Sequence, residues 1–381
     1  MLYSYLKGGD LSNMEFFKRF FAKKCAVGGL DLGSRSLKLV QLSAKKDKTY
    51  ELTSLLLGDP PNQTLKDGLI VDSRALGDHI KQLILSYKLN IKEVVGVASG
   101  KSVVLRPIHM QKMDAKDVNN ALRFHAGNYL PYNAEDAMIK GAILQPELED
   151  DPTQMEVLLI AAPNEVVKNA QDVIRFSGLN PKTIDMEPLA LGYILGISVE
   201  PEVLAKTVAL VHIGASYTSI NIYEGGTLKQ SRVVGVAGNR FTEVISQAFN
   251  ISFEEAEKMK EEKGIIRVEK DATPVAPTTM RIFNTITPVL SQLVTEIRRS
   301  FDYYMRQFKD GSIDYILLSG GSAKFKNIDA YISNELDIKC SVMNPFSKID
   351  ISKVQGYDTN TLNELAPSLT VALGLALRSI V

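Results

Sequence analysis

Short apolar runs return in the same order twice along the chain, and they predict two similar sheets. Nearly continuous apolar runs over 27–32 and 207–213 are typical of buried strands, and each is followed by a glycine. An alternating strand, a polar turn and a third strand follow each run. These later strands are predicted over 36–42 and 50–56 in the first copy, and over 217–223 and 228–234 in the second. The repetition predicts an internal duplication with copies roughly 180 residues apart.

Amphipathic segments separate and follow these strands, which indicates an α/β protein. The helices that the pattern predicts cover 74–88, 115–129, 163–177, 240–249, 253–263 and 366–378. Another helix is predicted to begin at Pro288, capped by Thr287, and one near Lys324 after a strand over 314–319. Between the copies, strands over 93–98 and 103–107 are predicted to pair as a hairpin, and a further strand covers 155–161.

Composition and charge narrow the classes of partner. The 381 residues carry 44 basic and 44 acidic side chains, which argues against a generalised nucleic-acid binder. Cys25 and Cys340 are far apart and lack metal-ligand spacing, which argues against a disulfide framework and a zinc ribbon. Because no apolar run approaches the ~20 residues that span a bilayer, we expect a cytoplasmic protein.

An aromatic and basic segment near the start is a candidate membrane anchor. In a helix, four phenylalanines of residues 14–24 would share one face, with lysine and arginine side chains beside it. This pattern is typical of an interfacial anchor, although rings that pack on the protein's own sheet or on a partner would give the same pattern. Residues 1–13 have no clear periodicity, and Met14 offers a second start.

Three turns that combine glycine with hydroxyl side chains follow predicted buried strands. They contain Gly33, Ser34 and Ser36, then Gly214, Ser216 and Thr218, and finally Gly320, Gly321 and Ser322. Glycine lets backbone N–H groups approach an anion, so the three turns together predict a phosphate site. The third turn is also predicted to open a helix, whose N-terminus favours phosphate. Asp31, before the first turn, is expected either to hold Mg²⁺ through water or to cap its own turn.

These turns resemble those of the actin-like ATPase superfamily. Asp31–Lys38 is similar to the first phosphate loop of actin, heat-shock ATPases and the division protein FtsA, and His212–Thr218 to the second. Leu318–Lys324 resembles the adenosine loop. Over roughly 26–381, further stretches extend the resemblance to the PilM family of type IV pilus assembly proteins. These stretches are 121–126, 129–131, 186–191, 296–304 and 366–376.

The resemblance implies an actin-like ATPase fold, with two duplicated halves around a nucleotide cleft and an inserted subdomain of the FtsA and PilM kind. The implied boundaries are 1–25 for an extension, 26–102 and 181–206 for the first large subdomain, 103–180 for the insert, 207–239 and 313–362 for the second large subdomain, 240–312 for the second small subdomain, and 363–381 for a closing helix. ATP or ADP with Mg²⁺ would lie in the cleft, held by the three turns together with Lys38 and Lys324. Glu257 and Lys260 match a ribose contact, or are a solvated pair on a charged helix.

One departure from the family concerns hydrolysis. His212 stands where relatives usually carry an aspartate that places the metal or the attacking water. A neutral imidazole is a poor ligand for Mg²⁺, and the alternative is a core histidine bonded to a carbonyl. We therefore expect slow hydrolysis or none. Residues 96–102 imitate a P-loop, but they have one residue too few between the glycines and are interpreted as a hairpin turn.

The functional expectation is a cytoplasmic ATP-binding scaffold of the type IV pilus platform, peripheral at the inner membrane. The resemblance implies that it grips the N-terminal tail of a PilN-like membrane protein in a groove between the first large subdomain and the insert. Other platform components are further partners, and a homo-oligomer or ring is left open. The alternatives are an FtsA-like division protein, a type II secretion relative and a small-molecule kinase on the same fold.

Overall fold

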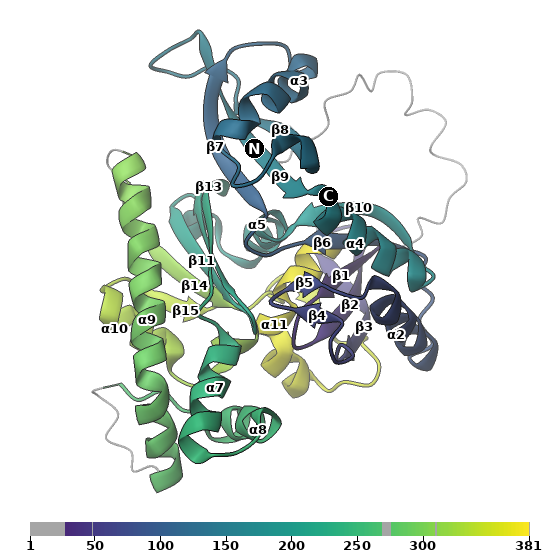
Figure 1. Ribbon diagram of the computed structural model, residues 1–381, viewed down its shortest axis with the longest axis vertical. Coiled ribbons are helices and arrows are strands. Elements are labelled where there is room, and N and C mark those ends of the chain that lie inside the picture. Colours follow the sequence, from purple (N-terminus) through teal and green to yellow (C-terminus); the bar gives the residue numbers. More distant parts are fainter. Residues whose placement is uncertain (1–26, 48, 269–275, 309–310, 381) are drawn as a thin grey trace.

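The computed structural model describes residues 27–47, 49–268, 276–308 and 311–380. It contains two twisted sheets side by side, each covered by helices, and a small separate sheet that projects from them (Figure 1). The candidate anchor at 14–24, the extension at 1–13 and Cys25 lie outside the described residues. Within the described ranges, no helix has both the length and the apolar character that crossing a bilayer requires.

The first sheet has the strand order β10-β6-β1-β2-β3-β16. Its strands are β1 (Gly28–Leu32), β2 (Leu37–Ala44), β3 (Tyr50–Gly58), β6 (Glu93–Ala98), β10 (Asn180–Met186) and β16 (Ile349–Asp350). β1 pairs antiparallel with β2 and parallel with β6. A small hairpin of β4 (Leu65–Lys66) and β5 (Leu69–Ile70) follows β3.

The second sheet repeats this arrangement in the order β13-β12-β11-β14-β15. Its strands are β11 (Thr207–Ile213), β12 (Thr218–Glu224), β13 (Thr227–Val234), β14 (Tyr315–Ser319) and β15 (Cys340–Val342). β11 pairs antiparallel with β12 and parallel with β14, as β1 does with β2 and β6. The duplication predicted from the apolar runs is therefore confirmed.

The helices that cover the two sheets differ in kind. The first half carries α2 (Ser73–Ser86), α4 (Asn164–Phe176), α5 (Glu187–Ser198), α6 (Pro201–Leu204) and α11 (Thr359–Leu377). The second half carries α7 (Gly238–Phe249), α8 (Phe253–Lys263), α9 (Pro277–Gln307) and α10 (Ile328–Leu336). α11 needs small residues because it lies against backbone. A Cβ atom on Gly374 of α11 would lie 2.0 Å from the carbonyl oxygen of Ala190. In the same way, a Cβ atom on Gly29 of β1 would lie 2.1 Å from the carbonyl oxygen of Ala372 in α11.

Two helices begin earlier than predicted, and each contains a proline. α9 begins at Pro277 and runs through Pro288, because its buried apolar stripe continues on both sides, from Ile282 to Phe301. Burial of this stripe outweighs the hydrogen bond that a proline inside a helix removes. α11 likewise begins before the predicted residue 366, capped by the side chain of Asp358, and contains Pro367.

The insert is a three-stranded sheet in the order β7-β9-β8, with a helix on one face. It consists of β7 (Val104–Gln111), α3 (Ala115–His125), β8 (Ala137–Gln145) and β9 (Gln154–Pro163). The predicted hairpin with 93–98 is wrong: β7 pairs with β9, because β1 and β10 already occupy both edges of β6. The predicted helix over 115–129 ends at His125, and β8 was not predicted. α4, inside the segment 103–180, packs against α2 and β6 of the first half.

Candidate nucleotide-binding cleft

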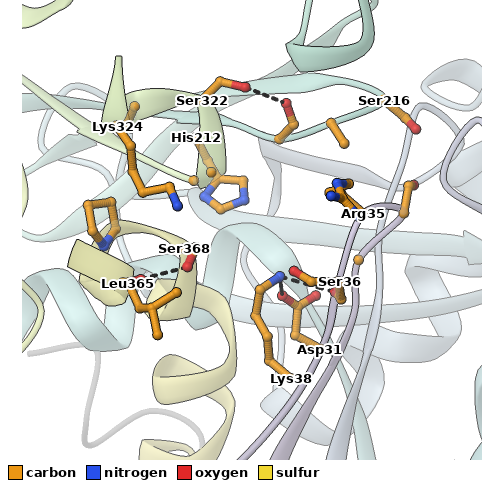
Figure 2. A pocket seen from close by; sticks show the side chains of 18 of the residues that line it. Asp31, Arg35, Ser36, Lys38, His212, Ser216, Ser322, Lys324, Leu365 and Ser368 are labelled. Carbon is orange, nitrogen blue, oxygen red and sulfur yellow. Dashed lines mark hydrogen bonds and ion pairs between the residues drawn. The ribbon is translucent and has the colours of Figure 1, made fainter. Parts of the chain in front are cut away.

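The turns that follow β1, β11 and β14 meet at a cavity of about 1040 Å³ between the two halves. Figure 2 shows side chains from both halves around this space, among them Lys38, His212 and Lys324. The sequence-predicted residues that line it are Asp31, Gly33, Ser34, Ser36, Lys38, His212, Gly214, Ser216, Glu257, Lys260, Gly320, Gly321, Ser322 and Lys324. Residues separated by almost 300 positions are thus brought to one cavity.

Thr218 does not belong to this lining. Its side chain is fully buried, and its hydroxyl donates a hydrogen bond to the carbonyl oxygen of Val236 at 2.7 Å. The alternation of β12 explains this, because Thr218 is the first residue of the strand and points to the interior of its own half. The prediction that Thr218 holds phosphate is therefore corrected to a structural role.

Asp31 and Lys38 form a buried ion pair at the first turn. They lie opposite each other on β1 and β2, and Lys38 Nζ is 3.0 Å from Asp31 Oδ2. The ammonium group also donates to the Ser36 carbonyl oxygen at 3.2 Å. Gly33 is required here, because a Cβ at this position would lie 2.7 Å from that same oxygen. The pair presents one cation and one carboxylate to the cavity.

The fit of a metal ion depends on this carboxylate. The described residues contain no group of three histidine, cysteine or acidic side chains that could hold a metal ion directly. Mg²⁺ in nucleotide sites commonly takes most of its ligands from phosphates and water, with one or two carboxylates nearby. Asp31 suits that arrangement through a water molecule, but its Oδ2 already accepts from Lys38. Asp31 therefore fits a Mg²⁺ ion that takes most of its ligands from bound phosphates and water.

His212 lines the cavity and is held by a hydroxyl group. Its Nδ1 is 3.0 Å from Ser319 Oγ, on the neighbouring strand β14. Burial lowers the pKa of the imidazole below its usual 6.5, while the nearby Glu187 and Asp31 carboxylates oppose this shift and Lys38 adds to it. The side chain is therefore neutral at pH 7 and supplies no negative charge for a cation. The alternative of a carbonyl-bonded core histidine is wrong.

Two residues that sequence reasoning did not select connect the halves across the cleft. Glu187, the first residue of α5, is buried and accepts hydrogen bonds from Tyr217 Oη and Ser219 Oγ, both at 2.6 Å. Burial and the Glu187 carboxylate raise the pKa of Tyr217 well above its usual value. The Tyr217 ring lies against Gly68 of the β4-β5 hairpin. The sequence signals were that 186–191 and 212–218 both belonged to family-like stretches, but the contact between them joins distant parts of the chain and was not predicted.

Glu257 and Lys260 on α8 are tied to α7 and are not a solvated pair. Lys260 Nζ is 2.6 Å from Glu257 Oε2 and 2.8 Å from Thr242 Oγ1, and the Thr242 hydroxyl also donates to Glu257. Burial lowers the pKa of Lys260, although the Glu257 carboxylate opposes this shift. The unpredicted lining residues include the exposed Glu261 and Arg35. Arg35 Nε lies 3.8 Å from Glu257 Oε1 and so reaches across the cleft.

The third turn depends on a glycine with a positive φ. Gly320 has φ 90°, and a Cβ there would lie 2.4 Å from the Ile213 carbonyl oxygen. At Gly321, by contrast, a Cβ would meet open space on the side of the cavity. The prediction that this turn opens a helix near Lys324 is wrong. A short 3₁₀ turn, Gly321–Lys324, comes first, and α10 begins only at Ile328.

Two duplicated α/β halves around a cleft lined by glycine–hydroxyl turns define an actin-like ATPase fold. Solved structures with this fold resemble the chain, among them MreB5 of Spiroplasma citri bound to ADP, with 16% identity, a TM-score of 0.52 and coverage of 94% of this chain and 98% of that one. EutJ from Carboxydothermus hydrogenoformans is similar at 17% identity and a TM-score of 0.52, over 92% of this chain and 89% of that one.

The particular family follows from a family model described as type IV pilus assembly protein PilM, which matches residues 29–380. The chain belongs to the PilM family. It is also similar to a solved structure, the PilM-PilN type IV pilus biogenesis complex, with 29% identity, a TM-score of 0.81 and coverage of 93% of this chain and 99% of that one. The cell division protein FtsA of Bacillus subtilis (strain 168) is 25% identical over 263 residues. These cover 62% of this chain and 57% of FtsA, so the chain spans less than two thirds of that relative.

Proposed function

We propose that the protein is a nucleotide-binding scaffold of the type IV pilus platform that holds the cytoplasmic tail of a PilN-like inner-membrane protein. Membership of the PilM family and the similarity to a PilM-PilN complex support this function. Attachment through such a tail would place the protein at the inner membrane. The observation that carries the proposal is a second pocket, which shares no lining residue with the nucleotide cleft.

This pocket, which we call the tail groove, has a volume of about 570 Å³ and lies between the insert and the first half. Met138 of β8 forms one wall, and α4 forms the other with Asn164, Glu165, Val167, Lys168, Asn169 and Gln171. Met138 leaves 45% of its surface exposed, although it is a large apolar side chain. A groove with one apolar wall and polar groups opposite suits an extended peptide with few apolar anchors.

The cleft is the proposed site of ATP or ADP. Backbone N–H groups of the turns at Gly33–Ser36 and Gly214–Ser216 would hold the phosphates, with Lys38 as a nearby cation. Gly321 and Lys324 would lie near the adenosine. Bound Mg²⁺ would neutralise the phosphate charge, with Asp31 contacting it through water. Because His212 is neutral and supplies no carboxylate, we propose that hydrolysis is slow or absent.

A synthetic peptide with the sequence of the PilN-like tail tests the proposed function. We expect calorimetry to give a micromolar or tighter dissociation constant with the full-length protein. Met138→Glu places a charge on the apolar wall and is expected to weaken binding at least tenfold. Met305→Glu is the matched control, because Met305 on α9 is 43% exposed and lies outside the tail groove. A peptide that fails to bind the wild type, or that binds both variants equally, contradicts the proposal.

A further inference from the structure

The insert is attached to both halves of the molecule, although the chain enters and leaves it on one side. The polypeptide passes from β6 into β7 and from β9 into α4, and β6 and α4 both belong to the first half. β7 nevertheless packs against β13 of the second half, and Figure 1 shows these strands side by side. The insert therefore spans the same two bodies that enclose the nucleotide cleft.

A buried ion pair fixes this second attachment. Lys229 of β13 has its Nζ 2.9 Å from Glu156 Oε2 and 3.3 Å from Oε1. The Glu156 side chain is only 6% exposed and that of Lys229 18%, so each charge relies on the other for the solvation that it has lost. We call this pair, with its two residues Glu156 and Lys229, the insert pin.

Apolar and polar contacts surround the pin. Leu105 and Leu158 of the insert share one buried core with Leu228 of β13, next to Lys229, and this core continues into the first half through Val97. Farther along the contact, Arg106 of β7 donates a hydrogen bond to the Tyr303 hydroxyl of α9 at 3.4 Å. Because packed interiors deform little, the insert sheet is expected to follow β13 when the second half moves.

The two walls of the tail groove are consequently attached to different halves of the molecule. β8 is part of the insert sheet, which the pin holds to the second half, whereas α4 packs more extensively on α2 and β6 of the first half than on β8 and β9. Closure of the two halves on a nucleotide would rotate β8 relative to α4. Such a movement changes the affinity for a peptide only if the peptide binds the two arrangements differently.

We infer that the insert pin couples the nucleotide cleft to the tail groove, so that bound nucleotide sets the affinity for the membrane-protein tail. This inference rests on the proposed function. Coupling between two binding sites is reciprocal, and it typically amounts to about 5- to 150-fold in affinity. ATP is therefore expected to change the dissociation constant of the tail peptide at least fivefold, and the peptide to change that of ATP by the same factor.

Lys229→Glu tests the pin, because it places a second carboxylate against Glu156 and pushes the insert away from β13. We expect the peptide and ATP each to bind this variant alone within about twofold of wild type, while the coupling factor falls to near one. The double variant Glu156→Lys with Lys229→Glu exchanges the two charges and should restore the coupling factor. Should Lys229→Glu fail to fold, the neutral pair Glu156→Gln with Lys229→Met replaces it and is expected to lower the coupling in the same way.

A matched control comes from the ion pair of Lys112 and Glu147. This pair lies within the insert and is far less buried than the insert pin. Neutralising it, by Lys112→Met with Glu147→Gln, should leave the coupling factor at its wild-type value. If the peptide and ATP bind the wild type independently, or if the pin variants keep full coupling, the inference is overturned while the proposed function stands. A peptide that does not bind at all refutes the proposed function instead.

Discussion

Replacing Lys38 with methionine removes the cation that neutralises Asp31 beside the cleft. The side chains of Lys38 and Asp31 are 10% and 13% exposed, so little water is available to solvate the carboxylate that remains. Losing one partner of a buried ion pair typically costs about 3–5 kcal/mol. Because a tenth of each side chain still reaches solvent, we expect a loss near the lower limit, about 3 kcal/mol of unfolding free energy.

Urea unfolding of the full-length protein measures this loss, and calorimetry with ATP measures the effect on the cleft. Lys38→Met is also expected to weaken ATP binding, because it removes a cation next to the proposed phosphate site. Lys116→Met is the control: Lys116 pairs with Asp114 at the surface, both side chains are 76% exposed, and we expect no measurable loss. Adding Asp31→Asn to Lys38→Met should recover part of the stability. A Lys38→Met protein that is as stable as wild type and binds ATP equally well would refute this reasoning.

Three further predictions concern the cleft. His212→Asp should raise ATP turnover above that of the wild type in a phosphate-release assay. For the wild type we expect a rate well below about one per second. Equal rates for the two proteins would show that the missing carboxylate is not decisive. Gly321→Glu should abolish ATP binding in calorimetry and leave the melting temperature unchanged, whereas Gly320→Ala should lower the melting temperature, because only Gly320 has a positive φ and a crowded Cβ position. Finally, the pKa of His212 is lower in the folded protein than the usual 6.5. As the pH falls below about 6.5, the unfolded chain is therefore protonated at this residue before the folded protein is, and the contribution of His212 to stability decreases. His212→Gln should therefore lose less stability than wild type between pH 7 and 5 in urea titrations, and parallel losses would contradict the assignment.

Features encoded within a few neighbouring residues could be predicted from the sequence. The runs that form β1 and β11 are apolar almost throughout because both faces of these strands are buried, and the glycine turns after them follow directly. All predicted residues of the three turns except Thr218 line the cleft. It also identified the duplication, because the same local pattern occurs twice.

Features that depend on distant partners could not be predicted in this way. Local propensity favours a helix start at Pro288, but packing of the apolar stripe of α9 extends the helix through it. The pairing of β7 with β9 depends on both edges of β6 being occupied, which only the assembled sheet determines. Likewise, Glu187 and Tyr217 meet only when the two halves come together.

Hydrogen exchange of the full-length protein, with and without the tail peptide, tests the central claim most directly. The account predicts slower exchange of backbone amides in β8 around Met138 and in the first turns of α4, the two walls of the tail groove. Slower exchange that leaves both walls unchanged and appears only elsewhere, such as along α9, would contradict it.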